Sequence, residues 1–303
     1  MDSVLITGAN SGFGRLIAET LAKKGYTVAA GIRESAGRNA DAARTLVGRA
    51  KEAGWRLDVV ELDVADDTSV RGAVGRAIER AGHLDVVVNN AGFGAMGLTE
   101  CYTDDQIRAV FETNVLGANR VARAALPHMR ERRRGLLVAI SSTLAQLALP
   151  FSGFYTASKR ALEAVAEMYR YEAGPFGVDS VILEAGAFPT SATLKNLLPA
   201  DRARAASYGA VGELPDKIFG AFEERLRRPG GPDPQVVADA VAALIATPHG
   251  TRPLRTVVDA SLGAGVEAIN AIKSSVQQRL LANIGMRDHG APSGSSEGSG
   301  AKS

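Results

Sequence analysis

Short apolar runs rich in β-branched residues alternate along the chain with longer segments whose apolar residues recur every three or four positions. The short runs predict strands at residues 4–6, 26–32, 57–62, 84–88, 136–140, 178–183 and 254–258. The longer segments predict helices at residues 12–24, 41–53, 68–81, 103–134, 155–174 and 234–246. Apolar strands that alternate with helices indicate a parallel sheet covered on both faces. We therefore predict an α/β fold: a single Rossmann-type domain with a doubly wound parallel sheet of about seven strands.

Two regions depart from this alternation. The folded domain is predicted to span residues 1–287, with an insertion at about 188–232 that carries helical patches at 200–206 and 216–227. Insertions at the carboxyl ends of parallel strands commonly hold ligands, so we expect this one to contact the substrate. The Gly/Ser-rich residues 288–303 are predicted to be a disordered tail.

Two of the predicted helices carry further local signals. The long helix at 103–134 begins with a predicted capping box at Thr103, and Pro127 is expected to kink it or to end its first part. Residues 266–284 have the apolar spacing of an amphipathic helix. For that helix, packing on the domain or on a second subunit is favoured over a position at a membrane surface.

The charge balance argues against several classes of partner. The chain has 303 residues and a net charge of +2, which indicates neither nucleic acid nor an anionic membrane as a partner. The arginines at 132–134 suit a helix C-terminus better than a nucleic-acid patch, because no aromatic residues interleave them. No stretch predicts a membrane span or a signal peptide. The single cysteine, Cys101, excludes an internal disulfide and fits a reducing compartment, so we expect a cytoplasmic protein.

The sequence TGANSGFG at residues 7–14 lies between the first predicted strand and the first helix. A glycine-rich turn there directs backbone N–H groups and a helix N-terminus toward an anion, and a Cβ would block the approach. Such a loop predicts a phosphate cradle for a dinucleotide cofactor, and a glycine-rich hairpin without a ligand is the alternative. The predicted cofactor contacts in this loop are Gly8, Asn10, Ser11, Gly12, Phe13 and Gly14.

The end of the second strand distinguishes the two nicotinamide cofactors. An acid there would bind the free 2′-hydroxyl of NAD(H), whereas an arginine accommodates the 2′-phosphate of NADP(H). This chain has Ile32 in the acid's place, followed by Arg33 and Glu34, which favours NADP(H). An Arg33 that is only solvated is the alternative. Asp63 is predicted either to cap the next turn or to receive the adenine amine, with Val64 beside it in the cofactor site.

Tyr155 and Lys159 lie four residues apart in YTASK, on one face of a predicted helix. A tyrosine ionises at about pH 10 in water, and a neighbouring ammonium stabilises the phenolate and lowers that pKa. Such a tyrosine can exchange a proton with a carbonyl or alcohol oxygen.

Together, the motifs between residue 2 and about residue 260 resemble the short-chain dehydrogenase/reductase family. The loop signature, the position of Arg33 and the long insertion resemble the branch that contains 17β-hydroxysteroid dehydrogenase type 1 and retinol dehydrogenases. The resemblance rests on TGANSGFG (7–14), Asp63, NNAG (89–92), Asn114, Ser142, Tyr155 and Lys159. Ser142 precedes Tyr155 by thirteen residues, as the family's catalytic serine does, which selects it over Ser141. The family usually has Pro-Gly after the sixth strand, where this chain has Ala185-Gly186.

The resemblance implies a role for each matched residue. Tyr155 is the general acid/base, Lys159 lowers its pKa and holds the nicotinamide ribose, and Ser142 donates a hydrogen bond to the substrate oxygen. Asn114 supports a water relay behind Lys159. Beyond the glycine loop, the implied cofactor contacts are Arg33, Asp63, Val64, Asn90, Ala91, Gly92, Tyr155, Lys159 and Thr190. No metal site is predicted.

We therefore predict an NADP(H)-dependent oxidoreductase that interconverts a hydrophobic ketone or aldehyde with the corresponding alcohol. Family members are commonly dimers or tetramers, so a homodimer or homotetramer is expected. Apolar residues in segments that should line the pocket favour a hydrophobic substrate. They are Met96, Leu98, Leu144, Leu147, Leu149, Phe151, Phe188, Leu194, Leu197 and Leu198. The alternatives are a non-catalytic protein that senses NADP(H), and an epimerase or dehydratase of the same fold.

Overall fold

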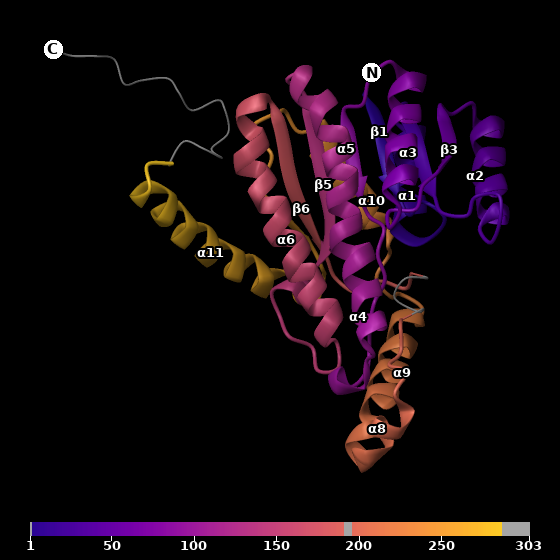
Figure 1. Ribbon diagram of the computed structural model, residues 1–303, viewed down its shortest axis with the longest axis vertical. Helices are drawn as coiled ribbons and strands as arrows, with labels where there is room; N and C mark the ends of the chain where they lie inside the picture. The colour runs from indigo at the N-terminus through magenta and orange to yellow at the C-terminus, as the bar shows by residue number, and fades with distance from the viewer. Residues whose placement is uncertain (1, 191–195, 287–303) are drawn as a thin grey trace.

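Seven parallel strands form one sheet in the order β3-β2-β1-β4-β5-β6-β7 (Figure 1). The computed structural model describes residues 2–190 and 196–286. The strands are β1 (Ser3–Thr7), β2 (Thr27–Ile32), β3 (Leu57–Glu61), β4 (Val86–Asn89), β5 (Gly135–Ser142), β6 (Val178–Ala185) and β7 (Arg255–Val258). The chain winds outward from β1 to β3 and then crosses to β4, so the strand order reverses beside β1. The predicted doubly wound α/β fold is confirmed, and every predicted strand lies within two residues of its observed bounds.

Helices cover both faces of this sheet. They are α1 (Gly12–Lys23), α2 (Ala40–Ala53), α3 (Asp67–Ala81), α4 (Asp104–Phe111), α5 (Ala118–Glu131), α6 (Gly153–Ala173), α8 (Arg202–Ser207), α9 (Leu214–Arg227), α10 (Gln235–Ala246) and α11 (Gly263–Asn283). Val4 and Ile6 belong to the apolar core beneath α1, α2 and α10, whereas Leu5 belongs to the core beneath α3 and α5. Successive residues of a strand point to opposite faces, so an entirely apolar strand serves both cores.

The helix predicted at 103–134 is divided in the structure. α4 begins at the predicted capping box of Thr103. A π-helical turn, η2 (Glu112–Gly117), then separates α4 from α5. Pro127 lies inside α5, which continues beyond it. The prediction that Pro127 ends part of the helix is therefore wrong.

The insertion predicted at 188–232 contains α8 and α9, which project beyond the edge of the sheet where the strands end (Figure 1). Residues 191–195 within it, including Leu194, lie outside the described residues, as does the predicted tail at 288–303. The rest of the insertion places α9 over the carboxyl end of the sheet.

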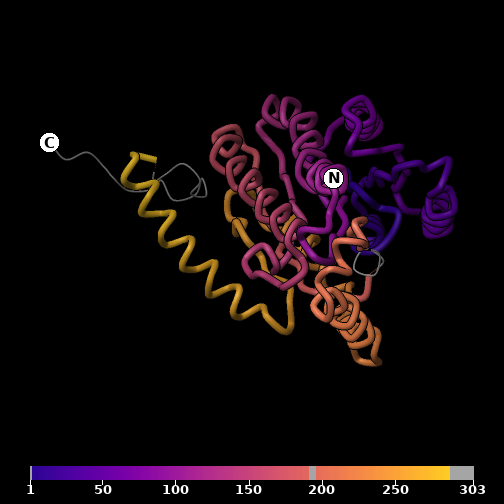
Figure 2. The backbone as a smooth tube through the Cα atoms, turned by 60° about the horizontal axis from the view of Figure 1, so that its bottom comes forward, coloured from indigo at the N-terminus to yellow at the C-terminus, as the bar shows by residue number. Residues whose placement is uncertain are grey.

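α11 begins beside β7 and then stands away from the domain (Figures 1 and 2). Val266 near its start is buried, but Ile272, Val276, Leu280 and Ile284 are each more than half exposed. α11 nevertheless contacts the domain through polar side chains: Asn270 is hydrogen-bonded to Glu184, Lys273 to Gln146 and Gln277 to Tyr171. Packing on a second subunit stays a prediction.

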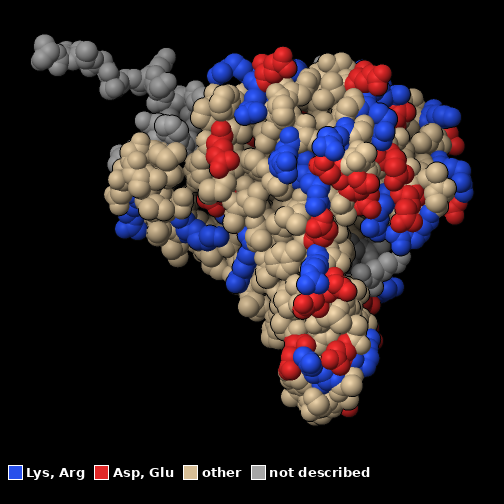
Figure 3. All heavy atoms as spheres, viewed as in Figure 1, with Lys and Arg blue, Asp and Glu red and all other residues tan. Residues whose placement is uncertain are grey.

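Charges of both signs are interspersed over the face drawn in Figure 3, which carries no large patch of one sign. Among the residues that the structure describes, no helix combines the length and apolar character needed to cross a bilayer.

Candidate active site

The glycine loop is a close-packed turn between β1 and α1. Gly8 and Gly12 have φ of 69° and 53°, in the left-handed region that favours glycine. A Cβ on Gly14 would lie 2.5 Å from Asn90 Nδ2 and still closer to the Gly8 carbonyl oxygen. Ser11 occupies the N-cap of α1, and its side chain makes no hydrogen bond to the first turn. The Ser11 side chain therefore leaves the N–H groups of the first turn of α1 available to an anion.

The NNAG turn holds this loop in place. Asn90 Nδ2 donates to the carbonyl oxygens of Thr7 and Gly8, at 2.8 and 3.3 Å. The backbone N–H groups of Asn90 and Ala91 donate to Thr7 Oγ1 at 3.0 and 2.8 Å. The ends of β1 and β4, neighbours where the strand order reverses, are thus tied together under the cradle.

Arg33 lies beside the cradle, at the end of β2. Its side chain is about half exposed, 3.9 Å from Asp63 Oδ2 and 3.8 Å from Glu34 Oε1. Glu61 shapes the turn, because its carboxylate accepts hydrogen bonds from the backbone N–H groups of Glu34 and Ser35 at 2.7 and 2.8 Å. Asp63 was predicted either to cap the next turn or to receive the adenine amine. The structure shows the first of these roles, because Asp63 Oδ1 accepts a hydrogen bond from the Ala65 N–H at 2.9 Å.

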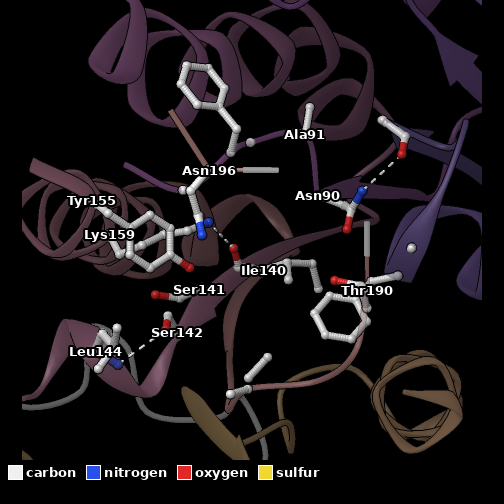
Figure 4. Close-up of a pocket in the computed structure, with 18 of the residues that line it drawn as sticks. Asn90, Ala91, Ile140, Ser141, Ser142, Leu144, Tyr155, Lys159, Thr190 and Asn196 are labelled. Carbon is white, nitrogen blue, oxygen red and sulfur yellow. Dashed lines mark hydrogen bonds between the residues drawn. The ribbon is translucent and has the colours of Figure 1, made fainter. Parts of the chain in front are cut away.

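Tyr155 and Lys159 lie on one face of α6, opposite Ser142 at the end of β5 (Figure 4). Lys159 Nζ lies 5.9 Å from the centroid of the Tyr155 ring and donates to the Ile140 carbonyl oxygen at 2.8 Å. Ser142 is buried, and its hydroxyl is hydrogen-bonded to the Tyr155 side chain. The structure thus brings together three of the four residues predicted to be catalytic.

The pKa values of Tyr155 and Lys159 both depart from the ordinary values of these side chains. Burial raises the pKa of Tyr155 above its ordinary value, and the hydrogen bond with Ser142 only partly opposes that rise. Burial also lowers the pKa of Lys159 to about 8, while the nearby Glu163 carboxylate acts in the opposite direction. Among the protein's own groups, burial therefore outweighs the hydrogen bond with Ser142, and the predicted lowering of the Tyr155 pKa by Lys159 stays a prediction.

Asn114, the fourth residue, lies in the π-helical turn and is buried behind Gly92. Its Oδ1 accepts from the Phe93 N–H, and its Nδ2 donates to the Phe93 carbonyl oxygen and to Ser158 Oγ, each at 3.0 Å. Asn114 therefore joins the loop after β4 to α6, next to the turn that carries Lys159.

One cavity of about 580 Å³ connects the cradle with Tyr155. The predicted site residues that line it are Gly8, Asn10, Ser11, Gly12, Phe13, Arg33, Asp63, Val64, Asn90, Ala91, Gly92, Ser142, Tyr155, Lys159 and Thr190. Gly14 and Asn114 lie just outside it, beneath the glycine loop and behind Gly92. The glycine loop and the Tyr155 side chain therefore face one continuous space.

The apolar lining differs from the predicted one. Met96, Leu144 and Leu149 line the cavity as expected. Phe188 is instead buried, with its ring 5.6 Å from that of Phe13, and Leu198 is exposed. Lining residues that the sequence did not reveal are Phe93, Gly94, Asn196, Phe219, Phe222, Glu223, Arg225 and Asp259. Of these, Phe93 and Gly94 lie in the loop after β4, and Asp259 directly follows β7; that position after a strand could have identified them.

A phosphate cradle next to a tyrosine that can exchange a proton is the arrangement of an oxidoreductase that uses a nicotinamide cofactor. Residues 2–199 match the short chain dehydrogenase family, and the chain belongs to that family. Enzymes of this family act on CH–OH groups with NAD(P).

Two relatives share more than a third of their aligned residues with this chain, and the second belongs to the branch that the sequence indicated. The chain is 36% identical over 190 residues to 3-ketodihydrosphingosine reductase of Bacteroides thetaiotaomicron, covering 63% of this chain and 65% of the relative. It is 38% identical over 193 residues to human 17-beta-hydroxysteroid dehydrogenase type 1, covering 62% of this chain and 57% of the relative. The matched regions thus span less than two thirds of either relative's length.

Two solved structures have the same fold. An actinorhodin polyketide ketoreductase with NADPH superposes with a TM-score of 0.71 at 29% identity, covering 86% of this chain and 97% of the other. A short chain dehydrogenase/reductase of Burkholderia phymatum in complex with NAD gives 0.72 at 25% identity, covering 88% and 92%. Both nicotinamide cofactors therefore occur among the structures that resemble this chain.

Proposed function

We propose that the protein is an NADP(H)-dependent oxidoreductase that interconverts a hydrophobic ketone or aldehyde and its alcohol, with Tyr155 as the general acid/base. The observation that carries this proposal is that Tyr155, Ser142 and Lys159 meet in the same cavity as the glycine cradle. The residues present fit a dinucleotide, because the cradle is closed to any Cβ where Gly8 and Gly14 approach Asn90.

Each residue has a defined task in carbonyl reduction. A bound nicotinamide cofactor supplies the hydride, and the glycine loop, Arg33 and Lys159 would hold that cofactor. Ser142 donates a hydrogen bond to the carbonyl oxygen and stabilises the charge that develops there. Tyr155 delivers its proton to the same oxygen. The raised pKa of Tyr155 keeps the phenol protonated near neutral pH, as this step requires.

The lining of the cavity supports a hydrophobic substrate. Met96, Leu144 and Leu149 line the same cavity as Tyr155, and Phe219 and Phe222 of α9 contribute aromatic surface from the insertion. Apolar walls with a few convergent polar groups favour a bulky carbonyl compound that is oriented through its oxygen.

A substrate panel tests the proposal directly. It should include steroid ketones, a long-chain 3-keto base and an aromatic polyketide, the classes in the names of the relatives and of the ketoreductase. We expect turnover of at least one ketone at the nicotinamide absorbance, faster with NADPH than with NADH. Tight NADPH binding without turnover of any compound would instead favour a cofactor sensor.

Replacement of Arg33 by alanine should raise the KM for NADPH about ten- to fifty-fold and leave the KM for NADH within about twofold. The reason is that a guanidinium beside the ribose forms charge-assisted hydrogen bonds with a 2′-phosphate and gains little from a hydroxyl. Steady-state kinetics with both cofactors measures this split. Arg44→Ala is the matched control, since Arg44 is an exposed arginine of α2 paired with Asp41. Equal losses with both cofactors would refute the NADP(H) preference.

A further inference from the structure

Glu163 is a buried acid directly behind the proposed active site. It lies on α6 four residues after Lys159 and is only 3% exposed. Its Oε1 accepts a hydrogen bond from Ser141 Oγ at 2.7 Å, and its Oε2 accepts one from Gln146 Nε2 at 2.8 Å. Ser141 precedes Ser142 at the end of β5 and also lines the cavity (Figure 4). One carboxylate therefore binds the strand that carries Ser142 to the helix that carries Tyr155 and Lys159.

Gln146 extends this connection to the loop after β5. Its Nε2 also donates to Glu184 Oε1 at 2.6 Å, and its Oε1 accepts from Lys273 Nζ of α11 at 2.9 Å. Glu184 is fully buried on β6, where it is paired in register with Ser141. The same loop carries Leu144 and Leu149 into the cavity. The carboxylates thus hold the substrate side of the site against α6.

We propose that Glu163 is a positioning residue for the reaction: its buried carboxylate fixes the Ser141–Ser142 strand end and Gln146 on α6, and supplies the negative charge nearest to Lys159 on that helix. This inference rests on the proposed function, because it assigns Glu163 to the support of Ser142 and Lys159. The carboxylate takes no part in proton transfer to the substrate.

The charge on Glu163 changes near neutral pH. Burial, together with repulsion from Glu184, raises its pKa to about 7. The titratable and charged groups that face it are Lys159 and Glu167 of α6, Glu184 of β6, Arg255 of β7 and Lys273 of α11. Above that pH the carboxylate is ionised and stabilises the Lys159 ammonium. Below it, Glu163 is neutral and the stabilisation is absent.

Glu163→Gln removes this charge and keeps the shape of the side chain. A glutamine can donate to Ser141 Oγ and accept from Gln146 Nε2, so the two contacts that position the strand and loop survive. We expect the alkaline limb of kcat for ketone reduction to move to lower pH by about one unit, which is about a ten-fold loss of kcat on that limb. At pH 6 the variant and the wild type should agree within about twofold, because the wild-type Glu163 is then mostly protonated and is neutral like the glutamine. NADPH binding should not change.

Two further variants complete the test. Glu167→Gln is the matched control, since Glu167 also pairs with Arg255, at 2.7 Å, but contacts neither Ser141 nor Gln146. Glu167→Gln should leave the alkaline limb of kcat at its wild-type pH. Ser141→Ala removes one positioning hydrogen bond and keeps the Glu163 carboxyl group, so we expect the maximal kcat to fall about five-fold. The pKa of Glu163 should rise in this variant, because the hydrogen bond from Ser141 lowers it in the wild type. This variant also tests the proposal if Glu163→Gln does not fold.

The outcomes that overturn the inference are definite. A folded Glu163→Gln enzyme with a wild-type pH profile, or an equal displacement in Glu167→Gln, would reject the electrostatic part. Wild-type kcat in Ser141→Ala would reject the positioning part. Loss of the proposed function itself has a different signature, since Tyr155→Phe would then keep its activity whatever Glu163 does.

Discussion

Replacement of Tyr155 by phenylalanine should lower kcat for ketone reduction about a thousand-fold and leave the Kd for NADPH within about twofold. General acid catalysis by a positioned side chain contributes about 10²- to 10⁴-fold, and the phenol is the group assigned to it here. The ring itself packs near Tyr102 and Val110, and phenylalanine preserves that packing. Single-turnover measurements of NADPH oxidation separate the chemical step from cofactor binding.

Tyr169→Phe provides the control for this variant. Tyr169 lies on the same helix, α6, is partly buried and donates its hydroxyl hydrogen to Asn119 Oδ1 at 2.5 Å. Its loss should cost one hydrogen bond, about 1 kcal/mol of folding stability, and leave kcat unchanged. Retention of near-normal turnover by Tyr155→Phe would remove Tyr155 from the mechanism and with it the proposed reaction.

The sequence predicted the sheet well because the signals for it are local. Each strand is a short apolar run that serves two cores, as Val4, Leu5 and Ile6 do in β1. The glycine loop and the Tyr155–Lys159 pair were equally accessible, since both depend on spacing within one turn or one helix. Local patterns of this kind depend little on tertiary contacts, so they can be recognised in the sequence alone.

Features that depend on tertiary contacts were less accessible. The π-helical turn places Asn114 against Phe93 and Ser158, and no pattern in residues 103–134 reveals that extra residue in the turn. The pKa of Tyr155 depends on how deeply the fold buries it, whereas the sequence supplied only the neighbouring charge. Phe219 and Phe222 reach the cavity because α9 lies at the carboxyl end of the sheet, a placement that no periodicity within the insertion specifies.

Replacement of Gly14 by alanine should raise the Kd for NADPH about a hundred-fold, a loss of about 2.7 kcal/mol of binding free energy. The added Cβ would meet Asn90 Nδ2 at 2.5 Å and the Gly8 carbonyl oxygen more closely still. The Gly8 carbonyl oxygen belongs to the backbone and cannot rotate away as a side chain could, so the loop has to shift away from α1. That shift weakens the hydrogen bonds from Asn90 to the carbonyl oxygens of Thr7 and Gly8. Overpacking of this kind also costs about 1–3 kcal/mol of folding stability. Titration of cofactor fluorescence and thermal unfolding measure the two effects.

Gly75→Ala is the matched substitution, in the exposed part of α3 where an added Cβ meets nothing within 4 Å. It should leave NADPH binding unchanged and stabilise the fold by about 0.5–1 kcal/mol, because alanine is a better helix former than glycine. The contrast isolates the loop, since both variants add one methyl group at a helical glycine. If Gly14→Ala bound NADPH and unfolded like Gly75→Ala, the turn would have room for a Cβ at this position, and close packing against Gly8 and Asn90 could not be the reason for Gly14.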